Sequence, residues 1–73
     1  MDRQRQLRHL VQAEAHVASS LRRIARQQEI IAAFRLHGDD AEQAEAILVT
    51  FEQTLRLHEG HLAQIRNELW LGE

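Results

Sequence analysis

His37-Gly38-Asp39-Asp40, at the middle of the 73-residue chain, is the stretch that decides the fold. Glycine just after a helical pattern is the usual residue that ends a helix, because it adopts positive φ angles at little cost. Either aspartate can then accept hydrogen bonds from the free N–H groups that begin a second helix. Glu42 and Gln43 follow at capping-box spacing. The stretch therefore predicts a tight turn between two helices.

No other boundary interrupts the chain, so we expect one helical-hairpin domain over residues 1–73. The helices are expected at about 3–36 and 40–70, with the turn at 37–40. The chain has no Cys, no Pro and only three Gly, which excludes a disulfide scaffold and argues against a sandwich or barrel. It also lacks an apolar run of about 18 residues and an N-terminal signal-peptide stretch. We expect a cytoplasmic protein with no membrane contact.

The second half shows a regular heptad pattern, with apolar residues spaced alternately by three and four. One member of this row, His58, is polar. The row continues for four repeats, which predicts one buried stripe along the whole second helix. Its members are Ala41, Ala44, Leu48, Phe51, Leu55, His58, Leu62, Ile65 and Leu69.

The first half carries two apolar rows. Leu10, Val17, Ile24 and Ile31 recur every seven residues. We expect Leu7 and Leu21 to flank them in the buried stripe, together with polar Glu14, Gln28 and Arg35. A neighbouring row of small residues predicts a second buried edge, because small side chains let two helix axes approach closely. This row consists of Val11, Ala18, Ala25 and Ala32.

These apolar residues exceed what one hairpin can bury, since a single core below 70–80 residues rarely supplies more than about 3–5 kcal/mol. We therefore expect an antiparallel all-α hairpin that pairs into a dimeric four-helix bundle by twofold symmetry. A different protein that covers the same face is the alternative. Trp70 is interpreted either as a partner anchor or as a lid on the open end, against Leu7 and Leu10. The expected interface comprises Val11, Ala18, Ala25, Ala32, Ile30, Ile47 and Trp70.

Charge divides between the two halves of the chain. Residues 1–37 carry seven Arg against three acids, and residues 38–73 carry two Arg against eight acids. We interpret this as two helices of opposite charge that lie side by side, with Glu52 and Glu59 within reach of Arg22. The alternative is a nucleic-acid surface formed by Arg22, Arg23 and Arg26. We favour it less, because no aromatic residue lies among these arginines and the net charge is −2.

The histidines are the remaining candidates for chemistry. If the chain bends near Gly38, residues whose numbers sum to about 77 face each other, which puts His16 opposite His61. His58 and His61 are neighbours on one helix. With Glu14 they form a candidate Zn²⁺ or Ni²⁺ ligand set. The simpler interpretation is a register-fixing His58 and solvated His9, His16 and His61. We expect no catalytic residues, no enzyme activity and no cofactor.

Several stretches resemble short bacterial helical-hairpin proteins with an Arg-rich first helix. The resembling segments are 15–18, 22–27, 30–31, 51–55 and 57–58. The resemblance implies a bacterial, cytoplasmic protein with no established activity, and it carries over no functional residue. The sequence thus favours a non-enzymatic, self-associating interaction or structural module. The alternatives are a His-cluster protein that binds a metal or another small ligand, and a small regulator associated with nucleic acid.

Overall fold

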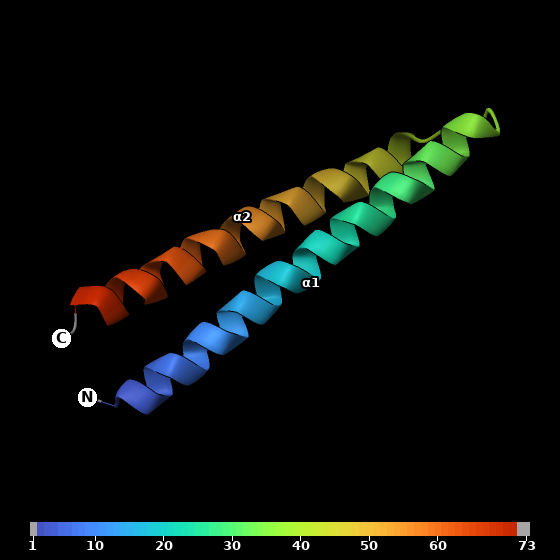
Figure 1. Ribbon diagram of the computed structural model, residues 1–73. Helices are drawn as coiled ribbons and strands as arrows, with labels where there is room; N and C mark the ends of the chain where they lie inside the picture. Colours follow the sequence, from blue (N-terminus) through green and yellow to red (C-terminus); the bar gives the residue numbers. More distant parts are fainter. Residues whose placement is uncertain (1, 72–73) are drawn as a thin grey trace.

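The computed structural model describes residues 2–71, which form two antiparallel helices, α1 (Arg3–Leu36) and α2 (Glu42–Leu71). The helices lie side by side along their length, with the start of α1 and the end of α2 at one end and the turn at the other (Figure 1). The predicted all-α hairpin is confirmed. α2 begins at Glu42, slightly later than the residue near 40 that the sequence indicated.

The turn ends α1 in a Schellman motif. Gly38 has a φ angle of +76°, the left-handed conformation that glycine adopts most readily. The Asp39 N–H donates to the Phe34 carbonyl oxygen at 2.8 Å, and the Gly38 N–H donates to that of Arg35 at 3.1 Å. These bonds satisfy carbonyl groups that have no partner within the helix.

Aspartates cap the starts of both helices. The Asp40 carboxylate accepts from the Glu42 N–H at 2.9 Å, and the Asp2 carboxylate accepts from the Arg5 N–H at 3.2 Å. Each cap satisfies an N–H group that the helix itself leaves free. Acidic Glu42 and Glu45 in the first turn of α2 add a favourable interaction with the helix dipole.

The inner row of α2, the stripe that faces α1, is the one that the heptad pattern predicts. All nine residues are buried or half-buried, His58 included. The alternation of three and four residues keeps them on one side of the helix over its whole length. Ala44, Leu62 and Ile65 are the most buried members within α2.

The inner row of α1 contains the predicted residues that recur every seven positions, but the flanking positions predicted to be buried with them are exposed. Leu7 and Leu21 are 41% and 51% exposed, and Glu14, Gln28 and Arg35 are exposed as well. Small and polar residues occupy the inner positions instead, because the short side chains of α1 leave room for the larger ones of α2. The observed inner row is Leu10, Ala13, Val17, Ser20, Ile24, Gln27 and Ile31.

The core consists of two separate clusters. Near the open end, Ala13 packs with Leu62 and Ile65, and Leu10, Val17 and Leu69 cover them. Near the turn, Ile31 packs with Ala41 and Ala44, which Ile30 and Leu48 cover. Phe51 and Leu55, between the two clusters, are only half-buried.

The contacts between the helices follow the expected register to within about one helical turn. His16 lies against His58, and Gln6 donates to Glu68 at 3.2 Å. Ion pairs of Arg35 with Glu45 and of Glu14 with Arg66 (3.4 Å) also cross the hairpin. The expected pairing of Arg22 with Glu52 or Glu59 is wrong, since within residues 2–71 Arg22 forms no ion pair. Exposed pairs of this kind contribute about 0–1 kcal/mol each.

The hairpin is long and thin, with principal extents of 56 × 14 × 12 Å and a radius of gyration of 16.7 Å. A compact chain of this length has a radius of gyration of about 11 Å. The accessible surface is 5785 Å², whereas a compact monomer of 8.5 kDa exposes about 4,700 Å². The chain thus leaves about 1,100 Å² more surface in water than a compact fold of its mass.

Candidate functional site

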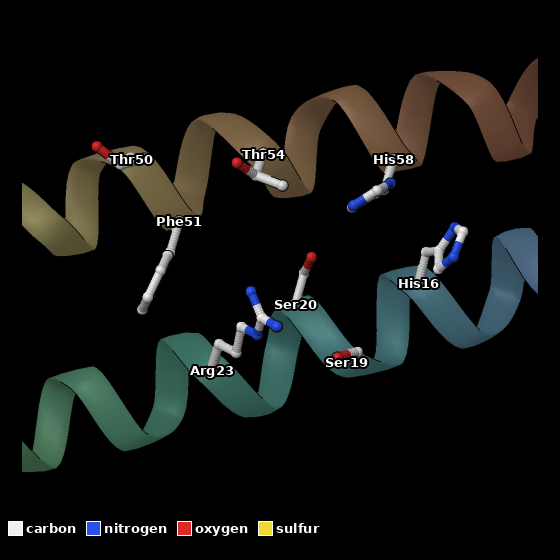
Figure 2. A pocket seen from close by; sticks show the side chains of 8 residues that line it. All are labelled: His16, Ser19, Ser20, Arg23, Thr50, Phe51, Thr54 and His58. Carbon is white, nitrogen blue, oxygen red and sulfur yellow. The ribbon is translucent and has the colours of Figure 1, made fainter.

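The middle of the hairpin, between the two core clusters, holds a hollow of about 350 Å³ that we call the Arg23 groove. α1 contributes four of its residues and α2 contributes the other four (Figure 2). They are His16, Ser19, Ser20, Arg23, Thr50, Phe51, Thr54 and His58.

On the α1 side, the groove exists because a small residue occupies the inner row. Ser20 is 6% exposed and fills little of the space between the helices. Its side chain and that of Arg23, three residues later, both extend toward α2 (Figure 2). A leucine at position 20 would fill the hollow, so the groove depends directly on the serine.

On the α2 side, Phe51 and His58 lie seven residues apart on the inner row and extend toward α1 (Figure 2). Phe51 provides an aromatic wall at one end of the groove. At the other end, the ring of His58 lies 5.1 Å from that of His16, with the planes tilted by 37°. The Thr50 hydroxyl donates to the Ala46 carbonyl oxygen at 3.4 Å, so it is occupied within its own helix.

The groove is lined by hydroxyl, imidazole and phenyl side chains and by one guanidinium group, which carries a fixed positive charge. No acidic residue lines it, and within residues 2–71 the Arg23 guanidinium forms no ion pair. The Ser19, Ser20 and Thr54 hydroxyls and the two imidazoles lie around it. Such a set is suited to bind an anion, because guanidinium, hydroxyl and imidazole groups can all donate to its oxygens.

The four candidate metal ligands lie in different surroundings. His16 and His58 are neighbours, whereas His61 lies with His9 and His16 around a second hollow of about 290 Å³. The Glu14 carboxylate is bound to Arg66. No group of three or more His, Cys, Asp or Glu side chains within residues 2–71 could hold a metal ion. A two-histidine pair falls short of the three or four protein ligands typical of zinc sites.

The three arginines of the nucleic-acid alternative lie on one side of α1, within about 100° of one another around the helix, but only Arg23 lines the groove. The positions of Arg22 and Arg26 turn them away from it by about 100° and 60° around the helix. All three are exposed. Only Arg23 is therefore positioned to act together with residues of α2.

The hairpin has two broad faces, one on each side of the plane that contains both helix axes. The expected interface residues are divided between these two faces. Val11, Ala25 and Ala32 are exposed, and Ala18 is half-buried. Trp70 is 82% exposed and lines a hollow with Leu10 and Leu69, so the interpretation of Trp70 as a lid on the open end is wrong. By heptad position Ile30, half-buried, and Ile47, 41% exposed, lie on the opposite broad face, together with the groove.

The hydroxyl residues of the groove were not among the site residues predicted from the sequence. Ser20 and Thr54 carry a usable signal, because their numbers sum to nearly 77 and both lie on or beside an inner row. Ser19 and Arg23 join them through helical spacing of three and four. The signal was weak, since serine and threonine do not contribute to a hydrophobic period.

Over residues 2–71, neither helix includes a segment with the length and hydrophobicity needed to span a membrane. No family model matches the sequence, and no curated protein or solved structure matches it significantly.

Proposed function

We propose that this protein is a non-enzymatic, self-associating helical hairpin that forms a homodimeric four-helix bundle. The observation that carries the proposal is the surface left over by the hairpin, about 1,100 Å² beyond that of a compact chain. A standard protein–protein interface buries about 800 Å² on each partner. One interface of ordinary size would therefore bring the chain close to the surface of a compact fold.

A second heptad row on α1, which we call the outer row, supplies a suitable contact stripe. Its large apolar members Leu7, Val11 and Leu21 are 41%, 64% and 51% exposed. At 100° per residue, the row lies about 100° around the helix from the inner row. In a four-helix bundle, each helix has two neighbours, and the directions from its axis to these two neighbours are nearly at right angles. The row consists of Leu7, Val11, Glu14, Ala18, Leu21, Ala25, Gln28, Ala32 and Arg35.

The outer row is nearly symmetric about Leu21, as an antiparallel contact between two identical helices requires. With a twofold axis at Leu21, Ala18 faces Ala25 of the second copy and Val11 faces Ala32. Leu21 then meets its own equivalent. The alanines on either side of the axis allow a close approach of the two α1 helices.

The polar members of the outer row fit the same arrangement. Glu14 faces Gln28 of the second copy, whose amide can donate to the carboxylate. Glu14 and Arg35 also have partners within their own hairpin, Arg66 and Glu45. Their charges are therefore not left unpaired when the row is covered, which would cost several kcal/mol.

α2 is compatible with the same twofold axis. Leu21 is level with Arg56 in the expected register, so the axis relates α2 residues on either side of position 56. Glu45 then faces Arg66 of the second copy, and Val49 faces Ala63. These two pairs combine opposite charges or apolar side chains. Glu52 faces Glu59 of the second copy, and the two Arg56 guanidinium groups lie at the axis among these four carboxylates, so each like-charge pair has opposite charges beside it. Ile30 and Ile47 lie outside this interface.

Sedimentation equilibrium at micromolar concentration tests the proposal. We expect a mass of twice 8.5 kDa for the protein as it is, and a monomer for Leu21→Arg, because that variant brings two like charges together at the axis. Leu57→Arg is the matched control, since Leu57 is 75% exposed and lies away from the outer row. A folded monomer for the unaltered chain, or equal dissociation by both variants, would contradict the proposal.

A further inference from the structure

We propose that the Arg23 groove binds a small phosphorylated molecule, with its phosphate at Arg23 and Ser20 and its organic part against Phe51. The groove lies on the broad face opposite the outer row, so this binding does not depend on the proposed dimer. Its volume of about 350 Å³ is at the lower end of the range for small-molecule sites, about 300–1,000 Å³.

Arg23 is the group that favours an anion. Within residues 2–71 its guanidinium has no ion-pair partner. Arg22 and Arg26 have none either, but only Arg23 of these three lines the groove. No carboxylate lines the groove. An anion that entered it would meet a positive charge that no protein carboxylate neutralises.

The neighbouring donors favour phosphate over a carboxylate. A phosphate presents three or more acceptor oxygens, which a planar guanidinium contacts through two parallel bonds. The Ser20 side chain lies beside Arg23 and extends toward the same space, with Thr54 on the facing helix (Figure 2). A carboxylate would leave one or more of these donors without an acceptor.

Phe51 and the histidine pair favour an organic part on the ligand. The Phe51 side chain lies across the gap between the helices, beside Arg23 (Figure 2), and is half-buried. A flat ring could stack on it with a gain of about 0.5–1.5 kcal/mol beyond the burial of area. Inorganic phosphate alone fills only part of the hollow, so we expect it to bind more weakly than a phosphate ester.

The test is a titration with phenyl phosphate and with inorganic phosphate, followed by backbone and imidazole NMR resonances. We expect saturable shifts at Ser20, Arg23 and His58, with tighter binding of phenyl phosphate. Arg23→Gln should weaken that binding by about tenfold or more, because a charge-assisted hydrogen bond is lost. Arg22→Gln makes the same charge change one position away and should alter it by less than about twofold.

A second variant tests the geometry. Ser20→Ala removes one hydroxyl with little change in volume, and we expect a loss of about threefold to tenfold while the helical circular dichroism is unchanged. The proposal is overturned if the folded, unaltered protein shows no saturable shift with phenyl phosphate. It is also overturned if Arg22→Gln and Arg23→Gln weaken binding equally. Tighter, steeply salt-dependent binding of duplex DNA that both variants reduce would assign these arginines to nucleic acid instead.

Discussion

The side-chain amide of Gln27 donates a hydrogen bond across the hairpin to the backbone carbonyl oxygen of Ala44, at 2.9 Å. Gln27 is 7% exposed and Ala44 is 5% exposed. The bond therefore lies in a nearly dry environment, where an unpaired polar group would cost about 1–3 kcal/mol. It ties the inner rows of α1 and α2 together beside the cluster nearest the turn.

Gln27→Glu should destabilise the hairpin by about 2 kcal/mol or more. The carboxylate has the size of the amide but no hydrogen to donate, so it would face the Ala44 oxygen as a second acceptor. Gln53→Glu makes the same change at an exposed position outside the inner rows, the outer row and the groove, and should stay within about 0.5 kcal/mol. Urea unfolding at one fixed protein concentration measures both. Equal effects would show that the Gln27 bond does not contribute.

Ile65→Ala should remove most of the stability of the fold. Ile65 is 3% exposed and belongs to the open-end cluster, and such truncations cost about 2–5 kcal/mol. That loss is comparable with the whole stability expected from a core of this size, about 3–5 kcal/mol. Leu57→Ala, at a position 75% exposed, should cost less than about 0.5 kcal/mol. Thermal unfolding followed by circular dichroism would contradict this if both variants melted alike.

Substitution of the two internal glycines by alanine should change the stability of the hairpin in opposite directions. Gly38→Ala places a Cβ at a φ angle of +76°, which costs about 1–2 kcal/mol. Gly60→Ala should instead stabilise α2 by about 0.5–1 kcal/mol, because alanine is the better helix former. A Cβ at either position would meet nothing within 4 Å. The change in stability therefore depends on the backbone conformation alone. Melting temperatures that move in the same direction would refute the comparison.

Trp70 should report on association, given the proposed dimer. It is the single tryptophan of the chain and is 82% exposed in one hairpin. With the axis level with Leu21 and Arg56, Trp70 lies beside the turn end of the second copy and loses contact with water. Its emission should shift to longer wavelength on dilution, and Leu21→Arg should show the shifted emission at every concentration. Emission independent of concentration in the unaltered chain would contradict the expectation.

The turn and α2 could be predicted from the sequence because their signals are local or strong. Gly38 and Asp40 end and begin helices through backbone geometry and a single side chain. The apolar row of α2 has only one polar member. On α1 the signal was misleading, since Leu7 and Leu21 are more hydrophobic than Ala13 and Ser20. Which row faces inward depends on fitting the side chains of α2, and a hydrophobic period does not contain that information.

The candidate site was harder to predict for a related reason. The sequence selected histidines by their chemistry and placed His16 near His61 by register. His16 and His61 do line one hollow, but the ring contact of His16 is with His58, one turn away. Ser20 and Thr54 belong to no catalytic or metal-binding motif, and only their register across the hairpin points to the groove, because their part in it depends on the space between the helices.

The separation of the core into two clusters has a consequence for how the hairpin opens. The Arg23 groove lies between the clusters, where the inner-row residues Ile24, Phe51 and Leu55 are only half-buried, so apolar packing is weaker there than within either cluster. Thermal opening can therefore begin at the termini and stop at the groove, while the turn end stays closed. Amide hydrogens around Ile65 should then exchange with solvent faster than those around Ile31. A molecule held at Arg23 and Ser20 would join the two halves, and protection at the open end would rise.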